Sequence, residues 1–143
     1  MSSVALNPYL TFAGTARQAM EFYHRVLGGT LDVQTFGDAG APVSEGYKDN
    51  VMHARIDAEA LVIMASDAQE GSTPVVGDNV NLSLTGGPED RDRLTRIFAE
   101  LSDGGTVAMP LTDAPWGATF GMFTDRFAVN WLVNIDKAAA QPS

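Results

Sequence analysis

The sequence predicts an α+β protein in which two βαβββ modules pair to form one cupped, mixed sheet of eight strands, with a helix from each module on the outer face. Two observations lead to this fold class. A segment that combines an amphipathic helix pattern, a Gly-Gly pair and a strand pattern occurs twice, at 15–35 and at 88–110. Within it, the tripeptide Gly-Gly-Thr at 28–30 recurs at 104–106. Such a repeat is typical of modules that bury their apolar faces only by pairing.

Length, composition and charge limit the functions that the chain can have. At 143 residues it suits a single compact domain. It has no Cys, which excludes disulfides and thiolate metal sites. Its formal net charge is −9 and no basic cluster stands out, so nucleic acid is not an expected partner. No apolar run approaches the ~20 residues of a membrane helix and the N-terminus has no signal-peptide layout, so we expect a cytoplasmic protein with no membrane partner.

The whole chain, 1–143, is predicted to be one domain built from the two modules. A stretch with Gly, Ser and Pro among polar residues indicates a linker between them. The first module covers about residues 4–66, the linker about 67–78 and the second module about 79–136, with a short tail at 137–143.

The first module contains the more clearly marked helix. Thr15 is a candidate N-cap, and Gln18 completes a capping-box pattern. Gly28 ends the helix by supplying a left-handed conformation that other residues adopt only at a cost. The other elements expected here are strands at 4–12, 31–36, 51–56 and 61–65, and a loop at 37–49 that is long enough to cover a ligand.

The second module begins with a strand at 79–85 whose residues alternate. Asn79, Asn81 and Ser83 share its polar face, as expected of a strand with helices on one side and a polar space on the other. A helix follows from Pro88, where a first helical turn favours proline. Three further strands are predicted at 106–111, 119–124 and 129–135.

Six segments that together span nearly the whole chain carry a resemblance to a known superfamily. They are NPYLTF (7–12), MHARI (52–56), MASD (64–67), GGTVAMPL (104–111), PWGATFGMFTDRF (115–127) and NWLVNI (130–135). In order and spacing they resemble the vicinal oxygen chelate superfamily, which contains glyoxalases, bleomycin-resistance proteins and extradiol dioxygenases. The closer resemblance is to its PhnB-like, 3-demethylubiquinone methyltransferase-like branch. It implies a glyoxalase-like fold and, by analogy, a homodimer.

The resemblance also implies where a metal would bind, because catalytic members hold a divalent ion with His, Gln or Glu on four strands. Those positions fall on Pro8, Met64, Asn79 and Leu132 in this chain. None is a good ligand, and the only histidines are His24 and His53. We therefore expect no superfamily-type metal and no cofactor. Glyoxalase or dioxygenase chemistry does not follow from the fold alone.

His53 is the candidate catalytic residue. It lies in a predicted strand whose polar face it shares with Arg55 and Asp57, where a histidine can act as a general acid or base near neutral pH. Arg55 can bind a carboxylate or a phosphate group. The alternative for His53 is a structural or solvent-facing histidine.

Other polar, aromatic and apolar side chains are candidates for contacts with a ligand in the cup. The amides near the cup can orient a small molecule or bond to one another. Trp116, on a Pro-Trp-Gly turn, can form an aromatic wall or a dimer contact. Tyr47 lies in the long loop, from which it can close over a ligand. The candidate ligand-binding set is Tyr47, Arg55, Met64, Asn79, Asn81, Trp116, Asn130 and Leu132.

Three functions remain open at this point. The first is a PhnB-like protein that binds a small molecule in the cup without a superfamily-type metal. The second is a metal-dependent lyase or dioxygenase with relocated ligands, such as His53 with a nearby Asp. The third is a protein that sequesters an antibiotic, as bleomycin-resistance-like members do. The sequence leaves open whether the chain catalyses any reaction.

Overall fold

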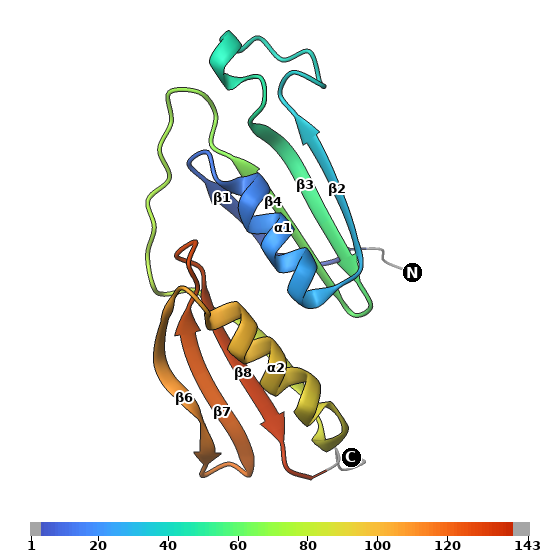
Figure 1. The fold of residues 1–143 in the computed structure, drawn as a ribbon, viewed down its shortest axis with the longest axis vertical. Coiled ribbons are helices and arrows are strands. Elements are labelled where there is room, and N and C mark those ends of the chain that lie inside the picture. Colours follow the sequence, from blue (N-terminus) through green and yellow to red (C-terminus); the bar gives the residue numbers. More distant parts are fainter. Residues whose placement is uncertain (1–3, 139–143) are drawn as a thin grey trace. The chain divides into compact units, whose positions relative to one another are not determined.

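The computed structural model describes residues 4–138 of the chain. They form two compact units, one that ends at Val75 and one that starts at Val76. Each unit contains one long helix and four strands in the order βαβββ (Figure 1). The predicted fold class, α+β with two βαβββ modules, is therefore confirmed. Hydrogen bonds join the strands as two four-stranded sheets, and a cup formed by both remains a prediction.

In the first unit, α1 (Ala16–Leu27) packs on one face of a sheet with the strand order β1-β4-β3-β2. β1 runs parallel to β4, and the other neighbours are antiparallel. The helix contacts β2, β3 and β4. The strands are β1 (Tyr9–Phe12), β2 (Thr30–Thr35), β3 (Val51–Ala58) and β4 (Leu61–Asp67), and the short 3-10 helix η1 (Glu45–Tyr47) lies between β2 and β3.

The second unit repeats this arrangement. α2 (Arg91–Ser102) packs on a sheet with the order β5-β8-β7-β6, in which β5 runs parallel to β8. The other neighbours are antiparallel. Its remaining elements are β5 (Leu82–Gly86), the 3-10 helix η2 (Pro88–Asp90), β6 (Thr106–Ala114), β7 (Ala118–Thr124) and β8 (Asn130–Asp136).

The repeated Gly-Gly pair lies between the helix and the next strand in both units. The first glycine of each pair has a left-handed φ, 79° at Gly28 and 83° at Gly104, and so ends its helix. The second glycine packs against the neighbouring hairpin. A Cβ atom on Gly29 or on Gly105 would lie 2.1 Å from a backbone carbonyl oxygen. The internal repeat in the sequence therefore reflects the same two requirements in both units: a left-handed first glycine and no room for a side chain on the second.

The start of α1 differs from the prediction. Thr15 occupies the N-cap position, but its hydroxyl makes no capping hydrogen bond, so the capping box with Gln18 is not what holds the first turn. Instead, the buried carboxylate of Asp67 accepts hydrogen bonds at 2.9 Å from the backbone N–H groups of Gly14 and Ala16. A side chain at the end of β4 therefore satisfies donors that a local cap usually satisfies.

The strand predicted at 79–85 starts later, at Leu82. Asn79 and Asn81 consequently lie before β5 and are exposed, rather than on the polar face of a strand. The physical reason is that a side chain holds this segment in place of a strand partner. Nδ2 of Asn130 donates to the carbonyl oxygen of Gly77 at 3.1 Å and approaches that of Val80 at 3.4 Å.

Other element limits show smaller differences. β1 starts at Tyr9, so the predicted strand at 4–12 is confirmed only in its last part. β6 continues through Pro110 to Ala114, which an edge strand with register shifts tolerates. Most of the predicted tail at 137–143 lies outside the described residues. No helix within residues 4–138 has the length and apolar character needed to span a bilayer.

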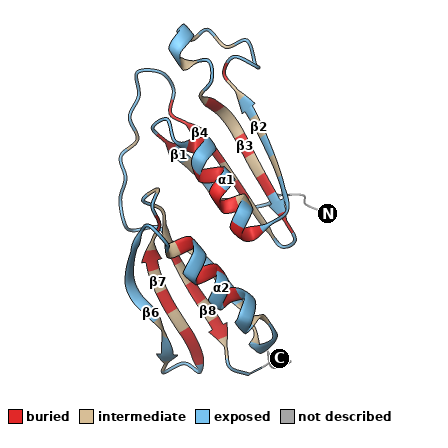
Figure 2. Ribbon diagram, viewed as in Figure 1, coloured by how far each residue is buried: buried red, intermediate tan, exposed pale blue. Residues whose placement is uncertain are grey.

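The two cores lie between each helix and its sheet. Buried residues follow the inner sides of the helices and the central strands, whereas β2 and β6 are largely exposed (Figure 2). The predicted strand at 129–135 corresponds to β8, in which burial alternates: Trp131, Val133 and Ile135 are buried and the residues between them are half-buried. We call the face of each sheet that its helix does not cover the open face.

Candidate functional site

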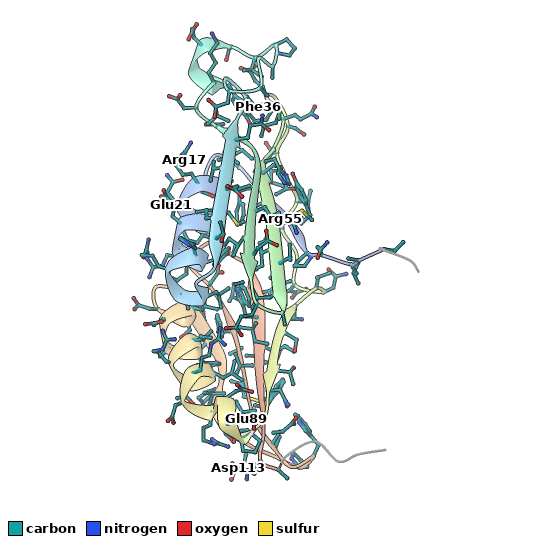
Figure 3. All side chains as sticks on the ribbon, turned by 90° about the vertical axis from the view of Figure 1, so that its right-hand side faces the viewer. Arg17, Glu21, Phe36, Arg55, Glu89 and Asp113 are labelled. Carbon is teal, nitrogen blue, oxygen red and sulfur yellow. The ribbon has the colours of Figure 1, made fainter. Side chains whose placement is uncertain are left out.

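One residue from each strand of the first sheet forms a row across its open face. Asp32 pairs with Arg55, Arg55 with Met64, and Met64 with Tyr9 in the strand register. We call these four residues the first open row. Arg55 lies across the sheet from Arg17 and Glu21 of α1 (Figure 3). Along this row, Met64 lies between the guanidinium group of Arg55 and the phenol ring of Tyr9.

Arg55 already has an anionic partner. Its Nε and Nη2 atoms lie 2.7 and 2.9 Å from the two carboxylate oxygens of Asp57, two residues along β3. Both side chains are a little under half exposed, at 43% and 49%. This bidentate pair lowers the pKa of the Asp57 carboxyl and raises that of Arg55, chiefly through the hydrogen bonds. A ligand anion at Arg55 would therefore share the guanidinium with Asp57.

Removing the guanidinium should raise the pKa of Asp57 toward its ordinary value. In the folded protein, the ion pair is complete above the lowered pKa of Asp57 and is lost as the pH falls through it. In Arg55→Gln, NMR titration of the Asp57 carboxyl should show protonation at a higher pH. The matched control is Glu70, whose pKa a hydrogen bond from Ser44 lowers and which should titrate unchanged. An unchanged Asp57 titration would contradict the pairing.

His53 lies beside this row and contacts Tyr9. The Tyr9 hydroxyl and Nδ1 of His53 share a hydrogen bond of 3.2 Å, and the ring centroids are 5.7 Å apart. Tyr9 is 48% exposed, so the pair reaches solvent on the open face. Sequence reasoning missed Tyr9, because its neighbours in space come from the parallel pairing of β1 with β4, which periodicity does not reveal. The other histidine, His24, bonds through Nε2 to the carbonyl oxygen of Gly29 at 2.9 Å.

The second sheet carries a corresponding row that is mostly apolar. Met109 pairs with Met122, Met122 with Leu132, and Leu132 with Ser83, one residue from each strand. We call these four residues the second open row. Met109 is 43% exposed, and Met122 and Leu132 are half-buried although no helix covers this face. The result is an apolar strip that α2 does not cover.

Two asparagines of β8 flank Leu132 in this strip, and each is held by both ends of its amide. The Asn130 oxygen accepts from the Thr124 hydroxyl at 2.8 Å while its nitrogen holds the segment before β5. The Asn134 oxygen accepts from Nε1 of Trp116 at 3.0 Å, and its nitrogen donates to Asp136 at 3.1 Å. An amide oxygen can accept two bonds and its nitrogen can donate two, so each oxygen retains an acceptor direction and Asn134 retains a donor.

A match to a family decides where this chain belongs. The model of the Glyoxalase/Bleomycin resistance protein/Dioxygenase superfamily matches residues 5–133. The chain belongs to this superfamily. The membership that the sequence segments predicted is confirmed.

Several known proteins are similar to this chain in sequence or in fold. Protein YjdN of Escherichia coli (strain K12) is 30% identical over 92% of this chain and 95% of its own length. The solved structure of PA1353 from Pseudomonas aeruginosa is 40% identical, covers 94% of this chain and 99% of that one, and has a TM-score of 0.84. The PhnB protein of Bacillus cereus, with 22% identity over 92% and 99% of the two chains, has a TM-score of 0.73 and shows likeness in fold alone.

The residues at the positions where the superfamily resemblance implies a metal do not fit a divalent ion. Pro8 and Leu132 have no donor atom in their side chains, and Met64 offers only a thioether. Asn79 lies outside a strand and offers one amide. Among residues 4–138, no group of three or more His, Asp and Glu side chains lies close enough together to hold a metal ion. Relocated ligands around His53 also have other partners, since Asp57 is bound to Arg55.

Trp116 and Tyr47, the two aromatic candidates, have different surroundings. Trp116 is 62% exposed on the turn between β6 and β7, and its ring meets Phe120 edge to face at 5.3 Å. It therefore stands at one end of the second open face. Tyr47 is half-buried in η1, where its hydroxyl donates to the carbonyl oxygen of Ala68. In this conformation Tyr47 anchors the long loop to the body of the first unit.

Within each unit, then, only some of the predicted site residues come together. The first unit brings Arg55, Met64 and His53 to one face, and Tyr47 lies apart in the loop. The second brings Asn130, Leu132 and Trp116 to one face, with Asn79 and Asn81 in the segment before β5. Their roles in binding and catalysis stay predictions.

Proposed function

We propose that this protein binds a small organic molecule against the open faces of its sheets without a superfamily-type metal ion. The observation that carries this proposal is the second open row. An apolar strip that α2 does not cover is formed by Met109, Met122 and Leu132. This is unusual, because the apolar face of a sheet is normally buried against another helix or sheet. An apolar ligand body is a fitting cover for it.

The flanking amides support a ligand that also carries polar groups. Asn130 and Asn134 are oriented by bonds to Thr124 and Trp116 and need not reorganise when a ligand arrives. Their remaining hydrogen-bonding directions suit hydroxyl, carbonyl or amide groups. A neutral or weakly polar metabolite therefore fits this face better than a polyanion, which the net charge of −9 would repel.

A catalytic role for His53 belongs to the same proposal. The hydrogen bond between Tyr9 and His53 places two groups that can exchange a proton on the open face, next to Met64. A ligand on the first open row would lie beside them, with Arg55 as a cationic contact. In this proposal His53 accepts or donates the proton and Tyr9 orients the imidazole.

We further propose that the protein is a homodimer. Met109 and Trp116 are large, exposed apolar side chains on the second unit, and such residues are enriched in interfaces. Sedimentation at micromolar concentration should show a dimer. A clean monomer would refute this part of the proposal while leaving ligand binding open to its own test.

A ligand screen by thermal shift tests the binding proposal. A metabolite and drug panel should contain compounds that raise the melting temperature, because a ligand at 100 times its Kd adds about 2.7 kcal/mol to stability. Met109→Asp should abolish the shift. Val107→Asp is the matched control, since Val107 is 44% exposed on the same strand but pairs with Phe123 on the helix-covered side. Equal loss in both variants would contradict a site on the open face.

Metal analysis separates this proposal from a metal-dependent enzyme. Protein purified without a His-tag should contain far less than one equivalent of Zn, Ni, Fe or Mn, and chelators should leave ligand binding unchanged. Stoichiometric metal, together with binding that chelation removes, would overturn the proposal of a metal-free site.

A further inference from the structure

A hollow in the first unit lies apart from both open rows. It has a volume of about 440 Å³, within the range of small-molecule pockets. It is bounded by Phe36 directly after β2, by the loop that follows, by β3 and by the segment after β4. Figure 3 labels Phe36. The residues that line it are Phe36, Ala41, Pro42, Val43, Met52, Gln69 and Glu70.

Hydrogen bonds hold the wall of this hollow in place. The backbone N–H of Ser44 donates to Oε1 of Glu70 at 2.9 Å, and the Ser44 hydroxyl donates to Oε2. On the other side of the loop, the Tyr47 ring packs 5.3 Å from the Phe36 ring, and its hydroxyl is bonded to Ala68. The loop is thus fastened at two places, so a ligand would find the hollow already formed.

The lining of the hollow is mostly apolar, and its polar side chains offer hydrogen-bond acceptors. Five of the lining residues are apolar, and the two polar ones, Gln69 and Glu70, are adjacent. Each carboxylate oxygen of Glu70 accepts one hydrogen bond and retains a second lone-pair direction. The hydrogen bonds from Ser44 also lower the pKa of Glu70, so this carboxylate is ionised at neutral pH. Within residues 4–138, no side-chain hydrogen bond engages the Gln69 amide.

We propose that this hollow binds a small organic ammonium ion. The apolar part of the cation packs against Phe36, Val43 and Met52. The N–H groups of the cation donate hydrogen bonds to the carboxylate of Glu70 and to the amide oxygen of Gln69. No lining residue is cationic, and the net charge of −9 favours a cation further. An organic anion of the same size is excluded, because it would face an ionised carboxylate. The site does not depend on the function proposed for the open faces.

NMR titration with 2-phenylethylammonium, compared with 3-phenylpropionate as an anion of similar size, tests this inference. The cation should cause saturable shifts of the backbone amides of Ala41, Val43 and Met52, and the anion should cause none. If the cation binds no more tightly than the anion, the proposal is wrong. Shifts confined to Met64 or Leu132 would also overturn it, because they would place the cation on an open row.

Two variants and a matched control make the test specific. Glu70→Gln should weaken cation binding about tenfold, the loss expected for one charge-assisted hydrogen bond. Glu45→Gln removes the same charge from the neighbouring loop between β2 and β3, outside the lining, where Glu45 pairs with Lys48 at 2.8 Å, and it should leave the affinity nearly unchanged. Ala41→Phe fills the hollow while keeping Glu70 and should also abolish binding. Equal weakening in Glu70→Gln and Glu45→Gln, or full binding in Ala41→Phe, would overturn the proposed site.

Discussion

Replacing Gly29 with alanine should destabilise the first unit by about 4 kcal/mol, one of the largest effects that a single methyl group can have in this protein. Two costs combine at this position. The φ of 84° is one that residues with a Cβ adopt only with strain. The added Cβ would also lie 2.1 Å from the carbonyl oxygen of Asp57 and 2.6 Å from the Cβ of Ala58. Because one of these atoms belongs to the backbone, the β3–β4 hairpin must move.

Substitutions at two other glycines distinguish the cost of backbone strain from the cost of steric overlap. Gly28 has a left-handed φ of 79°, and a Cβ added there would meet nothing within 4 Å, so Gly28→Ala should cost only the strain, about 2 kcal/mol. Gly46 has neither a left-handed φ nor a close neighbour, so Gly46→Ala should change stability by less than about 0.5 kcal/mol. Urea unfolding followed by circular dichroism measures all three. A Gly29→Ala variant no less stable than Gly28→Ala would show that the hairpin adapts.

The Gly-Gly repeat also explains why the fold could be predicted from the sequence. The same steric requirement recurs at Gly105, where a Cβ would meet the carbonyl oxygen of Thr124 at 2.1 Å. Where the backbone of another strand lies this close, only glycine fits, so a glycine occurs at a fixed position between the helix and the strand and can be recognised in the sequence. The strong alternation in β8, with Trp131 and Val133 buried, provided a second clear pattern. Local rules therefore sufficed for the βαβββ order of both units.

The site was harder to predict because its geometry depends on register between distant segments. Met64 and Leu132 were expected to line a ligand site, but their neighbours Tyr9 and Ser83 come from parallel strand pairs. A shift of one residue in such a pair would turn every side chain to the other face, and sequence periodicity does not specify that register. The late start of β5, which leaves Asn79 outside the strand, depends on the side chain of Asn130, which holds this segment from a distant part of the sequence.

Comparison of the two open rows shows a difference between the units that the repeat in sequence conceals. The first open row carries Asp32 and Arg55 beside Met64, whereas the second carries Met109 and Met122 beside Leu132. The modules share a backbone plan, and their open faces differ in polarity. A charged or polar ligand group therefore suits the open face of the first unit, and an apolar group suits that of the second.

Asp67→Ala should cost the first unit about 4 kcal/mol, because a single buried carboxylate satisfies three backbone donors. Oδ1 accepts from Gly14 and Ala16, and Oδ2 accepts from Val51, each at 2.9 Å. Asp67 is only 3% exposed, so water does not readily replace it. The carboxylate ties the end of β4 to the first turn of α1 and to the first residue of β3, so its loss should loosen three elements together.

Two other substitutions serve as comparisons for Asp67→Ala: one keeps part of the hydrogen bonding at this site, and the other removes an exposed carboxylate elsewhere. Asp67→Asn retains one acceptor oxygen but turns an N–H₂ group toward the remaining donors, so it should recover little of the stability. Asp113→Ala removes an exposed carboxylate that pairs with Lys137 at 3.0 Å and should cost less than about 1 kcal/mol. Urea unfolding gives these differences, and hydrogen exchange should accelerate most at the amides of Ala16 and Val51. A cost for Asp67→Ala as small as that for Asp113→Ala would mean that water or a local cap replaces the carboxylate, and that β4 does not hold the start of α1.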